Sequence, residues 1–178
     1  MITPTLETER VILRPMTIAD AEAAYNNWTS DHEVAKYMCY NTHQSVSETI
    51  EWLTSVEASY SSENAYDWGF VLKETGELFG SGGLRYVQEH ELFEPGYNIM
   101  KKYWGRGLTT EAAGAMIDFA ARKLGADSIF ARHHKENPAS GKVMEKLGFV
   151  RTGEGTGKKF DGRIYETWEY IVRIDSAQ

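Results

Sequence analysis

Apolar residues in the first third of the chain recur mainly at helical spacing. This periodicity predicts a helix after Thr17, a short helix over residues 31–38 and a longer helix from Ser45 or Ser47 to Ser59. We expect the apolar side of the longest of these helices to comprise Ile50, Leu53 and Val56.

Strand-like alternation of apolar and polar residues dominates from Tyr66 onward. The alternation, with an earlier run of the same kind, predicts a first strand over residues 9–16 and a β-meander over residues 68–73, 78–88 and 96–100. Gly82 and Gly83 lie inside the meander, where paired glycines indicate a bulge or a close approach of two backbones.

The last part of the chain alternates helices with strands. Its pattern predicts a main helix over residues 109–124 ended by Gly125, a strand Ser128–His134, a helix over residues 139–147 and closing strands over residues 149–156 and Ile164–Arg173. The buried side of the main helix is expected to comprise Ala112, Ala113, Met116, Ile117, Ala120 and Leu124. The strands before and after this helix should be parallel neighbours joined by a right-handed crossover. The pattern indicates the α+β class, and the absence of a linker predicts one domain over residues 1–178.

Two glycines, Gly105 and Gly107, stand in the turn that leads into the main helix. Glycine allows positive φ angles and lets a ligand approach the main chain closely. The free N–H groups of the first helical turn then face that ligand, with the positive end of the helix dipole behind them. The turn therefore predicts a phosphate site, although a turn of this kind also serves as an ordinary connection.

A second polar cluster, Glu-Asn-Pro-Ala-Ser-Gly-Lys over residues 136–142, lies about 30 residues further on and opens a short helix. The two clusters together, in this order, resemble the GNAT family of acetyl-CoA-dependent N-acyltransferases. Its pyrophosphate loop reads Gln/Arg-x-x-Gly-x-Gly/Ala, and Lys102 takes the first place here. The opening Thr-Glu-Arg-Val-Ile-Leu-Arg-Pro over residues 8–15 and Phe-Glu-Pro-Gly-Tyr over residues 93–97 are similar to the branch that contains the ribosomal-protein N-terminal acetyltransferases.

The resemblance implies the GNAT fold, in which helices flank both faces of a twisted, mostly antiparallel mixed sheet whose central parallel strands splay apart. It implies acetyl-CoA as co-substrate and no metal. The residues expected to bind coenzyme A are Ile99, Met100, Trp104, Gly105, Arg106, Gly107, Leu108, Thr109, Asn137, Ser140 and Lys142. In this family the edge of the central strand, here Ile99 and Met100, pairs with the amide-bearing arm, and a main-chain N–H there can also hold the thioester oxygen. Asn137 is also a routine helix cap, and Lys142 is also a plain solvent-exposed lysine.

Catalysis in many family members uses a tyrosine that protonates the leaving thiolate, but Met144 occupies that position here. Methionine has no proton to donate. Ser140 lies one helical turn earlier and carries a hydroxyl, so we expect it to stabilise the leaving sulfur, with a helix cap as its alternative role.

The base that removes the proton of the amine has three candidates, Glu94, His133 and His134. We commit to Glu94. Some relatives use a carboxylate before the final hairpin turn, but this chain has Lys158 and Lys159 there.

The formal net charge of −7 and the pI near 5.3 argue against nonspecific nucleic-acid binding and tilt mildly towards a cationic or amine-bearing partner. Acidic and aromatic residues in two loops suggest a cage for such a cation: Tyr37, Tyr40, Glu89, Glu91 and Phe93. No apolar run is long enough to span a bilayer, so we expect a cytoplasmic protein without a membrane partner. A homodimer is left open.

The sequence thus predicts an N-acetyltransferase in which a substrate amine attacks directly, without a covalent enzyme intermediate. The branch resemblance implies a protein N-terminal α-amine as acceptor, while polyamines, amino acids and aminoglycosides stay open. The alternative is a catalytically inactive acyl-CoA-binding sensor. A nucleotide-phosphate enzyme is disfavoured because the glycine turn lacks a Gly-Lys-Ser/Thr ending.

Overall fold

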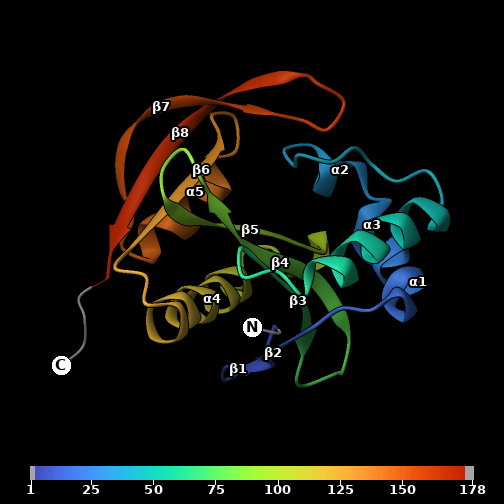
Figure 1. The fold of residues 1–178 in the computed structure, drawn as a ribbon. Helices are drawn as coiled ribbons and strands as arrows, with labels where there is room; N and C mark the ends of the chain where they lie inside the picture. The colour runs from blue at the N-terminus through green and yellow to red at the C-terminus, as the bar shows by residue number, and fades with distance from the viewer. Residues whose placement is uncertain (1–2, 175–178) are drawn as a thin grey trace.

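The computed structural model describes residues 3–174 and builds them around one eight-stranded sheet. The strands lie in the order β1-β2-β3-β4-β5-β6-β8-β7 (Figure 1). Their bounds are β1 Leu6–Glu7, β2 Val11–Arg14, β3 Ala65–Leu72, β4 Leu78–Val87, β5 Leu92–Ile99, β6 Ser128–His134, β7 Val150–Lys158 and β8 Ile164–Arg173. The predicted first strand is therefore shorter than expected and is preceded by β1, with which β2 pairs.

Five α-helices accompany the sheet. They are α1 Ala21–Ala24, α2 His32–Ala35, α3 Val46–Ser59, α4 Leu108–Leu124 and α5 Pro138–Lys146. Short 3-10 turns at Ile18–Asp20 and Lys101–Tyr103 and a π-helical turn at Tyr25–Thr29 connect them to their neighbours. The helix expected after Thr17 thus consists of three consecutive helical turns of different pitch.

The sheet is antiparallel throughout except between β5 and β6, which are parallel neighbours with Phe93 opposite Ile129. This pair lies near the start of both strands. Beyond it the strands diverge, so a gap opens between their carboxyl ends. Because α4 begins just after β5 and α5 just after β6, both helix N-termini lie at this gap.

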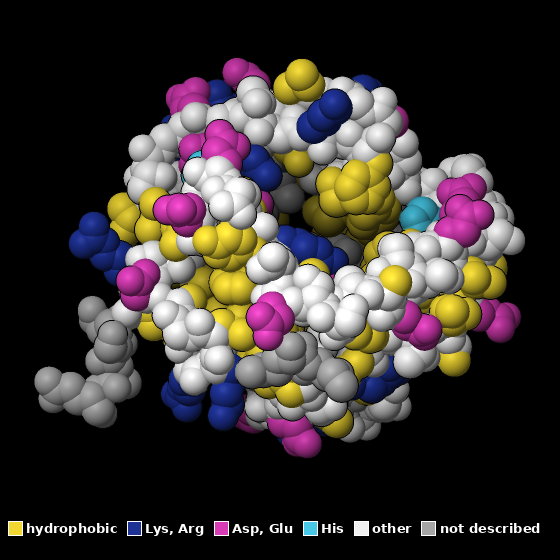
Figure 2. Space-filling model, viewed as in Figure 1, with side chains coloured by type: hydrophobic (Ala, Val, Ile, Leu, Met, Phe, Trp, Pro, Cys, Tyr) yellow, Lys and Arg dark blue, Asp and Glu magenta, His cyan; other side chains and the backbone are white. Residues whose placement is uncertain are grey.

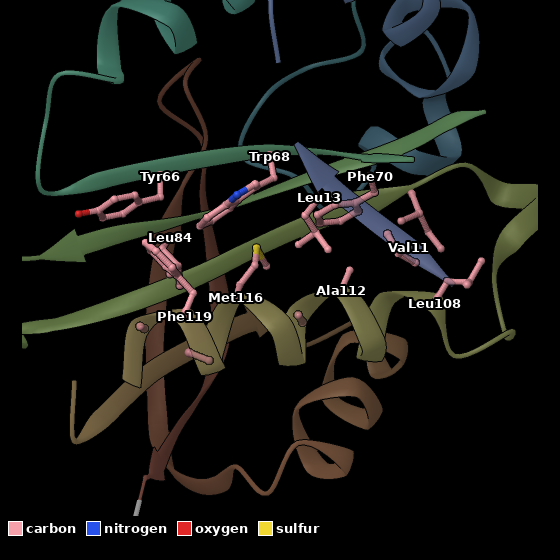
Figure 3. Packing of buried hydrophobic residues seen from close by; sticks show 14 of the residues in the cluster. Val11, Leu13, Tyr66, Trp68, Phe70, Leu84, Leu108, Ala112, Met116 and Phe119 are labelled. Atoms are coloured by element: carbon pink, nitrogen blue, oxygen red, sulfur yellow. The ribbon is translucent and has the colours of Figure 1, made fainter. Parts of the chain in front are cut away.

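Helices cover both faces of the sheet, as the predicted fold class requires. On one face α4 packs against β2, β3 and β4 through side chains that include Leu13, Trp68, Phe70, Met116 and Phe119 (Figure 3). On the other face a second apolar cluster joins α1, α2 and α3 to the sheet through Trp28, Val34, Leu53 and Leu78.

The buried side of α3 differs from the prediction. Ile50 is 39% exposed, while Thr49 is fully buried together with Leu53 and Val56. Thr49 tolerates this position because its hydroxyl lies 2.9 Å from the hydroxyl of Thr29 and 2.8 Å from Nδ1 of His43. A side-chain hydrogen-bond network therefore allows Thr49, and not Ile50, to lie on the buried face of α3.

The main helix α4 begins at Leu108 and ends before Gly125, close to its predicted bounds. Phe119 and Leu108 belong to its buried side, whereas the predicted Ile117 and Leu124 are only half-buried. In the meander, a Cβ on Gly82 would lie 2.8 Å from the carbonyl oxygen of Gly96, so two backbones approach closely there.

Candidate active site

The turn before α4 has the backbone geometry that its glycines predict. Gly105 and Gly107 have φ angles of +75° and +77°. Gly107 is the N-cap of α4 and provides no side-chain acceptor to the first helical turn. The N–H groups of that turn, with the positive end of the helix dipole, are therefore open to an external anion.

An ion-pair network attaches the start of the chain to this turn. Glu111, in the first turn of α4, accepts hydrogen bonds from the Thr8 hydroxyl at 2.6 Å and from the Arg10 main-chain N–H at 2.7 Å. The Arg10 guanidinium lies 2.6 Å from Glu111 and donates to the carbonyl oxygen of Arg106 at 3.1 Å. Burial favours the protonated acid, but the hydrogen bonds from Thr8 and Arg10 outweigh it and lower the pKa of Glu111.

This brace was not predicted as part of the site. Thr8 and Arg10 were visible in the sequence only as part of a family-like opening phrase, and nothing local connects them to Glu111, which lies 101 residues after Arg10.

The edge of β5 presents Ile99 and not Met100 towards the gap. The Met100 main-chain N–H donates to the carbonyl oxygen of Phe79 at 2.8 Å and is thus engaged with β4. Since alternate residues of a strand direct their main-chain groups to opposite edges, the N–H and C=O of Ile99 point towards β6. The Ile99 carbonyl accepts a hydrogen bond from Trp104 Nε1 at 3.0 Å, which ties the turn to the strand.

Other residues that were predicted to bind coenzyme A lie in different environments. The Arg106 guanidinium stands 5.3 Å from the centre of the Tyr103 ring. Leu108 is buried and anchors the helix start, whereas Thr109 is half-buried. Lys142 lies on the exposed surface of α5.

Two hydroxyl groups meet across the gap between β5 and β6. Ser140 Oγ, on α5, lies 3.3 Å from Tyr97 Oη, on β5. The Ser140 main-chain N–H also donates to Oδ1 of the N-cap residue Asn137, at 3.4 Å. Burial raises the pKa of Tyr97 to about 12, so its phenol stays protonated at neutral pH.

Tyr97 was not among the predicted site residues. It appeared in the sequence as one member of an alternating strand, and only the packing of α5 against β6 brings Ser140 to it. Met144 is 2% exposed and belongs to the core cluster, where it fills space between α5 and the sheet.

The adjacent histidines point to opposite faces of β6. His133 is 7% exposed, and its ring lies 3.2 Å from the hydroxyl of Tyr170 beneath α5. Burial lowers its pKa. His134 faces the other side, stacked on Tyr165 at 5.1 Å between ring centres. Its Nδ1 accepts the main-chain N–H of Glu136 at 3.1 Å, so the neutral ring carries its proton on Nε2.

The predicted base, Glu94, forms a bidentate pair with Arg132 of β6. Arg132 Nε and one terminal nitrogen lie 3.0 and 3.2 Å from its two oxygens. Burial raises the pKa of Glu94 although the guanidinium opposes this shift. Because Arg132 lies two residues before His134 on β6, Glu94 is on the same face as His134 and on the face opposite His133.

A cavity of about 700 Å³ lies on this second face. Its walls come from α2 and the loop that follows it, from His134 at the end of β6, and from the β7–β8 hairpin. Figure 2 shows the surface hollowed between that hairpin and the α2 region, with Lys and Arg side chains at its edge. The cavity thus adjoins the carboxyl end of β6, where the gap to β5 opens.

Hydrogen bonds join the two loops that wall the cavity. Lys159 Nζ donates to the Lys36 carbonyl at 3.2 Å, and the Phe160 main-chain N–H donates to the Cys39 carbonyl at 2.8 Å. Asn41 donates to Asp161 at 3.0 Å and accepts from Arg163 at 2.9 Å. The hairpin and the α2 loop therefore form one connected wall.

The predicted aromatic and acidic cage is not formed. Tyr37 lies against His134, Tyr40 against His43, and Phe93 packs among Tyr66 and Tyr86. Glu89 and Glu91 are exposed in and beside the β4–β5 turn. These residues diverge because the sheet and the α2 loop place their side chains in separate environments.

Within residues 3–174 no helix has the length and apolar character needed to cross a membrane. The same residues contain no group of three or more His, Cys, Asp or Glu side chains arranged to hold a metal ion.

Residues 10–150 match the family model described as an acetyltransferase (GNAT) domain. The chain is 32% identical to the uncharacterized N-acetyltransferase YoaA of Bacillus subtilis (strain 168), over 95% of this chain and 96% of that protein. It is 33% identical to the uncharacterized N-acetyltransferase p20 of Bacillus licheniformis, over 94% and 95% of the two chains. Its fold is similar to that of a ribosomal-protein-S5-alanine acetyltransferase from Vibrio fischeri, with a TM-score of 0.81 and 20% identity over 98% and 99% of the chains.

Proposed function

The chain belongs to the GNAT family of acetyltransferases, and on that premise we propose that it transfers the acetyl group of acetyl-CoA to a primary amine that enters from the cavity beside His134. The amine nitrogen attacks directly: a C–N bond forms, the C–S bond of the thioester breaks, the amine loses a proton and coenzyme A leaves as the thiol. The observation that carries this proposal is the Tyr97–Ser140 hydroxyl pair, which stands at the gap between β5 and β6.

The residues around the gap fit coenzyme A. The uncapped first turn of α4, after Gly105 and Gly107, provides main-chain N–H donors for a pyrophosphate. The β5 edge at Ile99 provides a main-chain N–H for the amide-bearing arm or for the oxygen of the thioester. Asn137 retains its carboxamide N–H₂ for the same arm, because its oxygen is used in the helix cap.

The hydroxyl pair would stabilise the sulfur that leaves. An ordinary thiol has a pKa of about 8.5, well below that of Tyr97, so the phenol keeps its proton and acts as a hydrogen-bond donor. Ser140, on α5, lies 3.3 Å from the phenol oxygen, and its hydroxyl can donate to sulfur while it accepts from Tyr97. This pair replaces the donor that methionine at position 144 cannot supply.

Glu94 would act as the base for the amine. Each of its oxygens accepts one hydrogen bond from Arg132 and retains capacity for a second. Burial makes it a stronger base than an exposed carboxylate. His133 faces away from the cavity, and Nδ1 of His134 already accepts a hydrogen bond from Glu136, so neither is as well suited.

The experiment that tests the function is acetyl-CoA-dependent release of free thiol by the purified chain, screened with N-terminal peptides, polyamines, amino acids and aminoglycosides. Acetyl-CoA binding is measured separately by calorimetry. Turnover with one class of amine would support the proposal. Saturable acetyl-CoA binding with no thiol release from any amine would contradict it and favour a binding module.

A further inference from the structure

The cavity beside His134 is cationic although the whole chain is acidic. Three of the side chains that line it are Lys36, Lys159 and Arg163, and His32 and His134 lie beside them. Within the part of the chain that the structure describes, none of its lining side chains is an aspartate or a glutamate. The net charge of −7 therefore does not describe the side chains that line this site.

The cationic side chains on this face have different partners. Arg163 is paired with Asp161 at 2.7 Å, and Arg132, deeper on the same face, is paired with Glu94. Lys159 instead directs Nζ to a neutral acceptor, the carbonyl of Lys36. Contact with Tyr37, and then the charges of Glu33 and Glu136, raise the pKa of Lys36, so both lysines contribute positive charge to the cavity wall.

The environment of Lys159 disfavours its positive charge. Burial first, and then the positive charge of Arg163, lower the pKa of its ammonium group. Lys159 is also half-buried in the β7–β8 hairpin. A bound anion would relieve both effects, while a second cation would increase them.

We propose that the acceptor is a small primary amine that also carries a carboxylate or phosphate group, and that Lys36 and Lys159 bind this anionic group in the cavity. The inference rests on the proposed function, which places the acceptor there. It replaces the cationic acceptor that the overall charge suggested.

Size and donor geometry agree with a small anionic acceptor. A cavity of about 700 Å³ is within the range that small-molecule sites occupy. His134 also lines the cavity, and its Nε2 carries a proton that it can donate, because its Nδ1 accepts from Glu136. The hydrogen bonds between the hairpin and the α2 loop hold the two lysines on one wall, so the site is organised before the acceptor arrives.

The test uses matched pairs of amines that differ only in the anionic group. Amino acids are compared with their amides, and phosphoethanolamine and glucosamine 6-phosphate with ethanolamine and glucosamine, by thiol release at saturating acetyl-CoA. N-terminal peptides and polyamines form a further arm. We expect kcat/KM to favour the anionic member of at least one pair by roughly ten- to a hundredfold, the range of one hydrogen bond to a charged group. Whether carboxylates or phosphates are preferred identifies the anion.

The variants Lys36→Gln and Lys159→Gln assign the effect to the cavity. Each should reduce kcat/KM for the anionic acceptor and leave its neutral counterpart and the KM for acetyl-CoA unchanged. The variant Lys159→Glu should lower the anionic preference further. Lys123→Gln, an exposed lysine in the last turn of α4, is the matched control and should change none of these values.

The outcomes separate this inference from the proposed function. Turnover that is equal for both members of every pair, or greater for neutral amines, polyamines or peptides, would overturn the anionic acceptor and leave the acetyltransferase intact. An anionic preference that survives both lysine substitutions would also overturn it. Absence of thiol release from every amine would contradict the proposed function itself.

Discussion

The two faces of the splayed strands are built by different means. On the α4 and α5 face the groups that we propose to bind coenzyme A are mainly backbone N–H groups at a glycine turn and a strand edge, positioned by the core beneath them. On the opposite face the cavity is walled by side chains from two loops, residues 32–44 and 159–165, that are distant in sequence.

This difference means that the two faces should respond differently to substitution. Backbone donors depend on a short local pattern and on the end of a helix, so any chain that keeps the pattern keeps the site. A wall made of loop side chains can change its charge by substitution without disturbing the core. The α4 and α5 face therefore indicates the reaction, and the opposite face, which carries the cavity, indicates the acceptor.

Removal of the hydroxyl pair is expected to give the largest effect. Tyr97→Phe and Ser140→Ala should each lower kcat by about a hundredfold, the range for loss of one positioned hydrogen-bond donor to developing charge, with acetyl-CoA affinity little changed. Because the two hydroxyls act as one unit, the double variant should lose less than the sum of the two free energies. Steady-state kinetics and calorimetry measure both quantities. Single variants that keep full kcat would remove the pair from the mechanism.

A substitution in the glycine turn should affect binding and not chemistry. Gly107→Ala places a side chain at a φ of +77° in the cap that faces the proposed pyrophosphate. We expect acetyl-CoA affinity to fall by about tenfold, or about 1.4 kcal/mol. Gly125→Ala, at +69° at the other end of the same helix, introduces similar backbone strain far from the site. It should reduce stability alone, and equal affinity losses in both variants would contradict the binding role of the turn.

Loss of the network that joins Thr8 and Arg10 to Glu111 should change how the free energy of unfolding depends on pH. The lowered pKa of Glu111 means that its stabilising contribution is present above the ordinary carboxyl range, near about pH 4, and is lost as pH falls through the folded-state value. Glu111→Gln should reduce the free energy of unfolding at neutral pH by roughly 1–3 kcal/mol. It should also flatten the acid side of the stability curve. Denaturant unfolding between neutral and acid pH measures both effects, and an unchanged acid limb would show that Glu111 is not its source.

The smallest effect is expected where the cavity walls meet. Asn41→Ala removes the exposed hydrogen bonds to Asp161 and Arg163 and should lower stability by less than about 1 kcal/mol. The KM for the acceptor should nevertheless rise a fewfold while the KM for acetyl-CoA stays constant, because only the cavity wall is loosened. Equal changes in both KM values would show that the two faces are not independent.

Short local patterns in the sequence predicted much of the α4 and α5 face. The bounds of β6 and the left-handed caps at Gly107 and Gly125 follow from short stretches of sequence, and the structure has them as expected. The buried side of α3 was predicted wrongly at Ile50, because the hydroxyl network of Thr29, Thr49 and His43 comes from three separate segments. The contact of Tyr97 with Ser140 was missed for the same reason, since it joins a strand to a helix 43 residues later.

The sequence by itself determined the fold class, the family and the glycine turn at the start of α4, because each depends on periodicity or on a few adjacent residues. Tertiary structure alone decided which hydroxyls meet at the gap, which strand N–H is free and what charge the cavity presents. These properties arise when segments more than 100 residues apart, such as Lys36 and Lys159, reach the same place. Total charge cannot report such a site, because it sums every residue, whereas a ligand responds to the few charges that surround it.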